Sequence, residues 1–216
     1  MGLDAILSSG LAQLGLNCSL AVQARLRDYV QLLDKWNRVY NLTSVRDPTE
    51  MVTRHILDSL VVLPYLRGTR VLDVGTGAGL PGIPLAIVSD EMCPEREFVL
   101  LDSNSKKTRF VQQAVAELAL TNVQVVHQRA EEFSPAVLFD VVVSRAFATV
   151  ADMLKNSGRH CAQDGVVLAM KGTEPVDELQ EIPAAYAVEA VHSLKVPGLK
   201  GERHLVVITP VANYSS

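Results

Sequence analysis

A glycine-rich stretch in the first half of the chain constrains the fold more than any other feature. Four glycines, Gly75, Gly77, Gly79 and Gly82, follow a short apolar run that contains Asp73. Glycine lets the backbone turn sharply and approach a ligand closely, and a helix that begins after such a turn offers unpaired N–H groups. The stretch therefore predicts a strand, a ligand-binding turn and a helix, in that order.

Beyond Gly68, short β-rich runs alternate with helical segments. The pattern predicts strands over residues 70–73, 98–102, 123–127, 140–144 and 165–170, and helices over residues 83–88, 106–119 and 150–161. Near-continuous apolar strands separated by helices indicate a parallel sheet covered on both faces. Residues 186–194 and 203–209 have no helix between them and predict an antiparallel pair. This order resembles the class I S-adenosylmethionine (SAM)-dependent methyltransferase fold, a Rossmann-like α/β sheet of five parallel strands with a C-terminal antiparallel hairpin.

The segment before Gly68 carries helical patterns instead of strands. Ser19 is a suitable N-cap for an amphipathic helix over residues 20–40, and a second helical stretch is expected after Pro48. We therefore expect a helical N-terminal extension of residues 1–68 packed on the core. Residues 69–216 should form the SAM-binding core as a single compact unit.

Composition excludes several classes of protein. The 216 residues are 48% apolar and 20% charged, which is typical of a folded domain and not of a disordered chain. We expect no signal peptide and no membrane span, because the first residues lack a basic region and no apolar run is long enough. Cys18, Cys93 and Cys161 are far apart and outside CxxC spacing, so we expect no zinc site, no disulfide framework and a cytoplasmic location.

Two classes of ligand fit the glycine turn. The last three glycines match the G-x-G-x-x-G dinucleotide fingerprint, and Asp102 follows twenty residues later. Against this, Asp73 precedes Gly75 by two residues, where a carboxylate would repel a pyrophosphate. The same carboxylate suits a ligand with a cationic amino-acid tail, such as SAM. We favour SAM and keep NAD as the alternative.

Other cofactor contacts are expected where the second and third strands end. Asp102 can accept both ribose hydroxyls in either interpretation. Ala130 and Glu131 follow the third strand and are candidates to contact an adenine. The alternative for Glu131 is an acid in the first turn of a short helix, where the helix dipole would stabilise it.

Five segments carry a resemblance that extends over nearly the whole chain. They are W-N-R-V-Y-N-L-T at residues 36–43, R-H-I-L-D-S-L at 54–60, the glycine stretch at 73–84, S-R-A-F-A at 144–148 and G-E-R-H-L-V-V at 201–207. In these segments the chain is similar to the bacterial 16S ribosomal RNA (guanine-N7) methyltransferase G family, also called glucose-inhibited division protein B. No motif position departs from the family pattern.

The resemblance implies SAM as the methyl donor and a guanine of 16S rRNA as the substrate. It implies cofactor contacts at Gly75, Leu80, Ala130, Glu131 and Arg145. The expected partner is 16S rRNA, the small ribosomal subunit or an assembly intermediate, with no metal and no membrane. We expect a monomer, because a compact enzyme with short loops gives no reason to require a dimer.

The residues agree with N7 chemistry. Exocyclic-amine methyltransferases commonly carry an Asn/Asp-Pro-Pro-aromatic run after the fourth strand, whereas this chain has Ser-Arg-Ala-Phe at 144–147. Cytosine-C5 enzymes need a cysteine at a strand end; here we expect Cys93 in a polar insertion and Cys18 and Cys161 in helical surroundings. Guanine N7 already presents a lone pair, so positioning and electrostatics suffice and no general base is needed.

Arg145 is the candidate for positioning the substrate. Arginine often binds guanine through O6 and N7 together, but that grip would occupy the attacking lone pair. Arg145 should therefore contact O6 or a phosphate, or the cofactor, and a structural ion pair is the alternative. The target guanine should be unpaired or flipped out, because the A-form major groove does not expose N7 to a pocket. Phe147 could stack on that base or belong to the core.

Further candidates to contact RNA lie outside the glycine stretch. His55 and Asp58 are three residues apart on a helix and can hydrogen-bond on one face, or pin the extension to the sheet. The remaining candidates are Asn41, Thr43, Lys171, Arg203 and His204. For Asn41 and Thr43 the alternative is that they end the preceding helix, and for the basic residues that they are solvated.

The net charge of −4 argues at first against RNA, but it is unevenly distributed. Residues 20–46 carry five basic against two acidic residues, residues 103–129 carry four against one, and residues 174–189 carry five acidic residues and no basic one. If the basic segments converge at the strand ends, an acidic protein retains an RNA-binding surface. Three rival functions stay open: a small-molecule methyltransferase, a non-catalytic RNA-binding or assembly protein, and an NAD-linked oxidoreductase.

Overall fold

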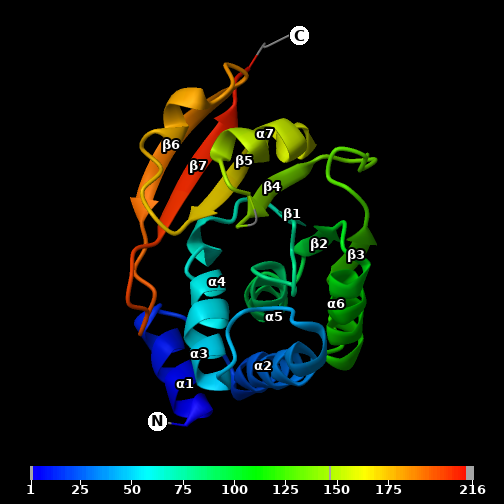
Figure 1. Cartoon of the computed structure of the whole chain (residues 1–216), viewed down its shortest axis with the longest axis vertical. Coiled ribbons are helices and arrows are strands. Elements are labelled where there is room, and N and C mark those ends of the chain that lie inside the picture. The colour runs from blue at the N-terminus through cyan, green and yellow to red at the C-terminus, as the bar shows by residue number, and fades with distance from the viewer. Residues whose placement is uncertain (1, 146, 213–216) are drawn as a thin grey trace.

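A seven-stranded sheet forms the centre of the computed structural model, which describes residues 2–145 and 147–212 (Figure 1). The strand order is β3-β2-β1-β4-β5-β7-β6. The first five strands are parallel, and β7 runs antiparallel to both β5 and β6. The strands are β1 (Arg70–Val74), β2 (Glu97–Asp102), β3 (Val123–His127), β4 (Phe139–Ser144), β5 (Cys161–Lys171), β6 (Tyr186–Ser193) and β7 (His204–Pro210).

The strand order reverses between β1 and β4, which pair directly. In such a sheet, ligands bind at the carboxyl ends of the strands beside the reversal. The glycine turn follows β1 at this edge, and Arg145 follows β4. The predicted site residues are therefore at the position where this topology places a ligand.

Helices cover the sheet unequally. The helices α5 (Gly82–Met92), α6 (Ser105–Glu117) and α2 (Leu20–Tyr40) share one buried cluster with strand residues such as Val71. The helix α7 (Val150–Ser157) packs on the opposite face, where Leu72 points. Figure 1 shows α2, α5 and α6 below the strands and α7 above them. Because neighbouring residues of a strand point to opposite faces, strands buried on both faces need continuous apolar runs.

The helical extension packs against α5 and α6. Its elements are α1 (Leu3–Gln13), α2, α3 (Pro48–Met51), the π-helix η1 (Val52–Leu57), α4 (Asp58–Leu60) and the 3₁₀ turn η2 (Leu63–Tyr65). Ser19 caps α2 by accepting from the Val22 N–H, as predicted. The Arg25 guanidinium forms an ion pair with Asp90 of α5 at 2.7 Å. The boundary at residue 68 stays a prediction, because one buried cluster includes residues on both sides of it.

The predicted helix over residues 150–161 is wrong at its end. The helix α7 stops at Ser157, a 3₁₀ turn spans Gly158–His160, and β5 begins at Cys161. His160 turns away from the helix to bond the Ala130 carbonyl at 2.9 Å, and Cys161 pairs with Phe139 of β4. Cys161 thus lies in a strand and Cys18 in the loop before α2, not in helices. Within the described residues, no helix has the length and apolarity to cross a membrane.

Candidate active site

The glycine turn is held to the neighbouring strand by backbone hydrogen bonds. The N–H groups of Gly75 and Thr76 both donate to the Leu101 carbonyl of β2, at 2.8 and 3.1 Å. Gly79 has a φ of +87°, and a Cβ there would lie 2.5 Å from the Ile83 side chain. A left-handed backbone against a packed side chain requires glycine at this position.

Asp73 lies beneath the turn and is fully buried. Its Oδ2 accepts from the Thr76 hydroxyl at 2.6 Å and from the Gly82 N–H at 2.9 Å, so it ties both ends of the turn together. Its Oδ1 is buried and has no hydrogen-bond partner among the described residues. Burial raises the pKa of Asp73 to about 6, although the Thr76 and Gly82 hydrogen bonds act in the opposite direction.

A cavity of about 160 Å³ opens at the carboxyl ends of β1, β2 and β3, and we call it the loop cavity. Its walls include Gly75, Asp102, Ala130, Glu131 and Phe147. Asp102 accepts from the Gly77 N–H through Oδ2 and from the Asn104 N–H through Oδ1, both at 2.8 Å. Glu131 lies in a turn, so its interpretation as a first-turn helical acid is wrong. Phe147, considered above as a base-stacking residue, lines this cavity.

A second cavity of about 270 Å³ lies between the extension and the ends of β4, β5 and β7, and we call it the arginine cavity. Its polar walls include Arg54, His55, Asp58, Arg145, Lys171 and Arg203. Arg145 lines this cavity and Phe147 lines the loop cavity, so residues close to the end of β4 contribute to both.

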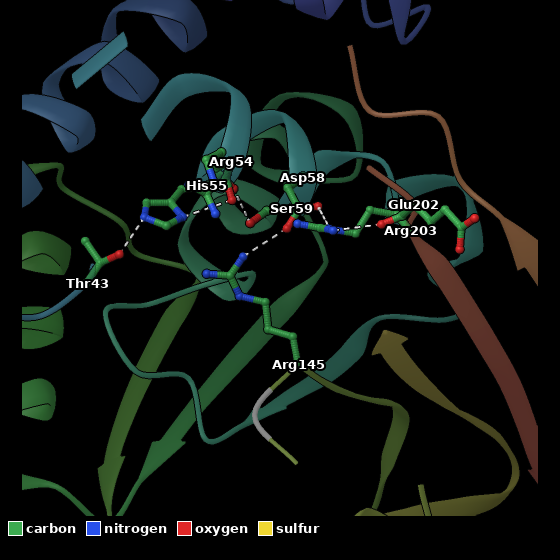
Figure 2. A network of polar contacts seen from close by, with 8 residues as sticks. All are labelled: Thr43, Arg54, His55, Asp58, Ser59, Arg145, Glu202 and Arg203. Carbon is green, nitrogen blue, oxygen red and sulfur yellow. Dashed lines mark hydrogen bonds and ion pairs between the residues drawn. The ribbon is translucent and has the colours of Figure 1, made fainter. Parts of the chain in front are cut away.

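Asp58 connects three parts of the chain in the arginine cavity (Figure 2). Its Oδ2 lies 3.2 Å from Arg145 Nη1, and its Oδ1 lies 2.7 Å from Arg203 Nε. The Asp58 side chain is 6% exposed, and each arginine side chain is 25% exposed. Asp58 therefore joins the extension to the sheet, as the structural alternative proposed. The ion-pair alternative for Arg145 also holds, although Arg145 lines the cavity.

His55 is held neutral and takes a different partner from Asp58. Its Nδ1 donates to the Arg54 carbonyl at 2.9 Å, and its Nε2 accepts from the Thr43 hydroxyl at 2.9 Å. This tautomer follows because a carbonyl can only accept. Burial, and then the nearby Arg145 charge, lower the pKa of His55 to about 4. The predicted contact between His55 and Asp58 is replaced by these two separate bonds.

Of the other predicted RNA contacts, some line the arginine cavity and some do not. Lys171 lines the arginine cavity, where its Nζ pairs with Glu178 at 2.9 Å. Asn41 does not line it; this residue ends α2 in the left-handed conformation and accepts from Arg46 through its side chain. His204 is buried on β7 with no described partner for its Nδ1.

The basic segments reach the strand ends in part, because Arg129 lines the loop cavity. In the segment of residues 20–46, Arg25, Arg27 and Arg38 all form ion pairs with aspartates. The arginine cavity is lined by four cations, and two of them, Arg145 and Arg203, pair with its lining carboxylate, Asp58. Among the described residues, no group of three or more His, Cys, Asp or Glu side chains is arranged to hold a metal ion.

The strand order and the glycine turn that follows β1 define a class I methyltransferase-type protein. Similar solved structures include TrmN from Thermus thermophilus (TM-score 0.56, 16% identity, 74% of this chain and 53% of that chain). The mitomycin 7-O-methyltransferase MmcR has a TM-score of 0.60 at 13% identity and covers 84% of this chain and 60% of its own. TrmK from M. capricolum, solved with S-adenosyl-homocysteine, has a TM-score of 0.54 at 15% identity over 70% of this chain and 67% of its own. At such identities the likeness shows the fold alone.

Sequence relatives identify the family. The family model GidB, described as rRNA small subunit methyltransferase G, matches residues 22–206, and the chain belongs to this family. A relative named ribosomal RNA small subunit methyltransferase G from Hahella chejuensis is 49% identical over 207 residues, covering 96% of this chain and 94% of that protein. One of the same name from Enterobacter sp. strain 638 is 52% identical over 204 residues, covering 94% and 97%. The family predicted from the sequence motifs is confirmed.

Proposed function

We propose that this chain transfers the methyl group of SAM to N7 of a guanine in 16S ribosomal RNA. The observation that carries the proposal is the pair of cavities to which residues close to the end of β4 contribute, Arg145 to one and Phe147 to the other. One cavity adjoins the glycine turn and the other gathers cations, so a methyl donor and a nucleotide can meet between them. The names of the relatives support the ribosomal RNA substrate, which would place the enzyme in the cytoplasm.

The loop cavity fits SAM better than a dinucleotide. Asp73 is fully buried under the turn and does not line the cavity, but its carboxyl, one oxygen of which has no partner among the described residues, would repel a pyrophosphate against the turn and attract a cationic tail. Gly75, Ala130 and Glu131 line the cavity together with Asp102 at the end of β2, whose carboxylate can accept from ribose hydroxyls. Gly77, Gly79 and Leu80 shape the turn, since the Gly77 N–H donates to Asp102 and the N–H groups of Gly79 and Leu80 both donate to the Thr76 carbonyl.

The proposed transfer to N7 needs no general base, and the described acid and imidazole in the arginine cavity are already engaged. Both Asp58 oxygens are engaged by arginines, and His55 Nε2 is engaged by Thr43. When bound, SAM supplies a methyl group on a sulfonium centre. The guanine N7 lone pair forms the new C–N bond as the C–S bond breaks, and no proton has to leave. Arg145 positions the guanine through O6 or its phosphate and leaves N7 free.

Labelled SAM tests the proposal. The protein is incubated with 30S particles, deproteinised 16S rRNA or small metabolites, and borohydride and aniline cleavage then identifies N7. Label in RNA that resists this cleavage would exclude N7, label only in metabolites would indicate a small-molecule enzyme, and no label at all would indicate a binding protein. Stabilisation by NAD and not by SAM would indicate the oxidoreductase.

An Arg145→Ala variant tests the positioning role. We expect kcat to fall about 10- to 100-fold with the fold retained, because misplaced reactants lose that much rate. Arg67→Ala is the matched control, since Arg67 pairs with Glu189 and lines neither cavity. Equal turnover in the two variants would remove Arg145 from the site. Size-exclusion chromatography of the wild-type protein tests the expected monomer.

A further inference from the structure

A larger cavity of about 540 Å³ adjoins the arginine cavity, and we call it the flank cavity. Arg54 and Arg203 line both cavities and form the wall that they share. The flank cavity lies between the extension and the connection from β6 to β7. Its other walls are Ile6, Thr49, Glu50, Thr53, Gly198, Leu199 and Lys200.

The flank cavity carries an excess of positive charge. Three cations, Arg54, Lys200 and Arg203, line it together with a single acid, Glu50, and Arg203 is also paired with Asp58 of the arginine cavity. The Arg54–Glu50 pair is 3.8 Å long and both side chains are more than half exposed, so solvent weakens it strongly. Lys200 is exposed and forms no ion pair with any described residue. Cations beside threonine hydroxyls are the groups that commonly contact nucleic-acid phosphates.

Lys200 is presented by a defined turn. Gly198 has a φ of +74° and Gly201 a φ of +127°, so left-handed glycines bracket Leu199 and Lys200. Leu199 packs against the apolar core and fixes one side of the turn. These features fix the backbone of the turn from which the Lys200 side chain lines the cavity.

We propose that the flank cavity binds the phosphodiester backbone of the nucleotide next to the methylated guanine. This inference rests on the function proposed above. A guanine turned into the arginine cavity remains covalently joined to its neighbours, so the backbone must leave across one of the walls of that cavity. Arg54 and Arg203 are themselves paired with Glu50 and Asp58, just as the α2 arginines and Lys171 are paired with acids. The wall of Arg54 and Arg203 differs in leading to Lys200, which forms no ion pair with a described residue.

Methyl-transfer kinetics at several salt concentrations test the inference on the full-length protein. Lys200→Ala is compared with Lys195→Ala, because Lys195 is exposed on the same connection but lines a different cavity. Losing one phosphate contact on single-stranded RNA should reduce the slope of log(kcat/KM) against log[salt] by about 0.7, or about fivefold in kcat/KM between 1 M and 0.1 M salt. We expect this change in KM for RNA with Lys200→Ala, none with Lys195→Ala, and restoration of the slope with Lys200→Arg.

The outcomes separate this inference from the proposed function. An unchanged slope in Lys200→Ala, or an equal change in both alanine variants, overturns the flank site while methyl transfer by the wild-type protein stands. A higher KM for SAM in Lys200→Ala overturns it as well, because the effect would then come from the cofactor side. Absence of methyl transfer by the wild-type protein refutes the proposed function, and the flank site with it.

Discussion

Replacing Tyr29 by phenylalanine tests how the extension supports the glycine turn. The fully buried Tyr29 of α2 donates its hydroxyl to the Ala78 carbonyl at 2.5 Å, in the middle of the turn. Phenylalanine keeps the ring, which packs near Phe110 with centroids 6.3 Å apart, and removes only the donor. A buried carbonyl left without a partner costs about 1–3 kcal/mol of stability.

For a chain of this length, each kcal/mol lowers the Tm by about 2–4 °C, so a loss of 2 kcal/mol corresponds to about 4–8 °C. The assay is urea unfolding together with thermal unfolding, each with and without SAM. Tyr65→Phe is the control, because Tyr65 is half-buried and its hydroxyl has no described hydrogen bond. If the two variants agree within about 0.5 kcal/mol, the Tyr29 hydroxyl does not hold the turn.

Two further predictions concern the buried polar groups. His55 has a folded-state pKa lowered from 6.5 to about 4, so its contribution to stability is present above pH 6.5 and is lost as the pH falls toward 4. Asp73 acts in the opposite direction, because its pKa is raised from 3.8 to about 6 and stability is lost as the pH rises through that interval. His55→Gln removes the His55 contribution, whereas the Asp73 contribution is common to variant and wild type. As the pH rises from 4 to 6.5, the variant should therefore lose stability relative to wild type, by up to about 3 kcal/mol in urea unfolding; a difference that does not vary with pH would contradict this. Gly82→Ala places a Cβ 2.1 Å from Leu100 Cδ2 and 2.8 Å from Asp73 Oδ2, and overpacking should cost about 1–3 kcal/mol. Gly2→Ala, where nothing lies within 4 Å, is the control, and equal stabilities would show that the turn has room for a side chain.

The strands and the long helix could be predicted from sequence because burial dictates their pattern. A strand covered on both faces needs a continuous apolar run, and α2 shows both its helical period and its Ser19 cap. The predicted helix end at residue 161 failed because the competing partners of His160 and Cys161 come from distant segments. The insertion of β7 between β5 and β6 likewise depends on pairing that local sequence does not encode.

The candidate site was predictable where residues follow strand ends, since parallel strands bring these ends to one edge. This places Gly75, Asp102 and Ala130 around one cavity and Arg145 and Lys171 around another. The division into two cavities was not predictable, because it depends on which way each side chain turns after its strand. The hydrogen bond of the Tyr29 hydroxyl was not predictable either. Helical periodicity places the ring in the core but does not indicate which acceptor the hydroxyl meets.

The ion pair between Asp58 and Arg203 joins residues 145 positions apart. A chain synthesised from its N-terminus has the glycine turn and all five parallel strands before Arg203 exists. The arginine cavity lacks one of its walls until Arg203 is added. In addition, β6 joins the sheet only through β7, which lies between β5 and β6 and is synthesised last. A nascent or C-terminally truncated chain can therefore form the turn that we assign to the cofactor well before it can form the place for the nucleotide. We therefore expect a chain that ends before β7 to be inactive.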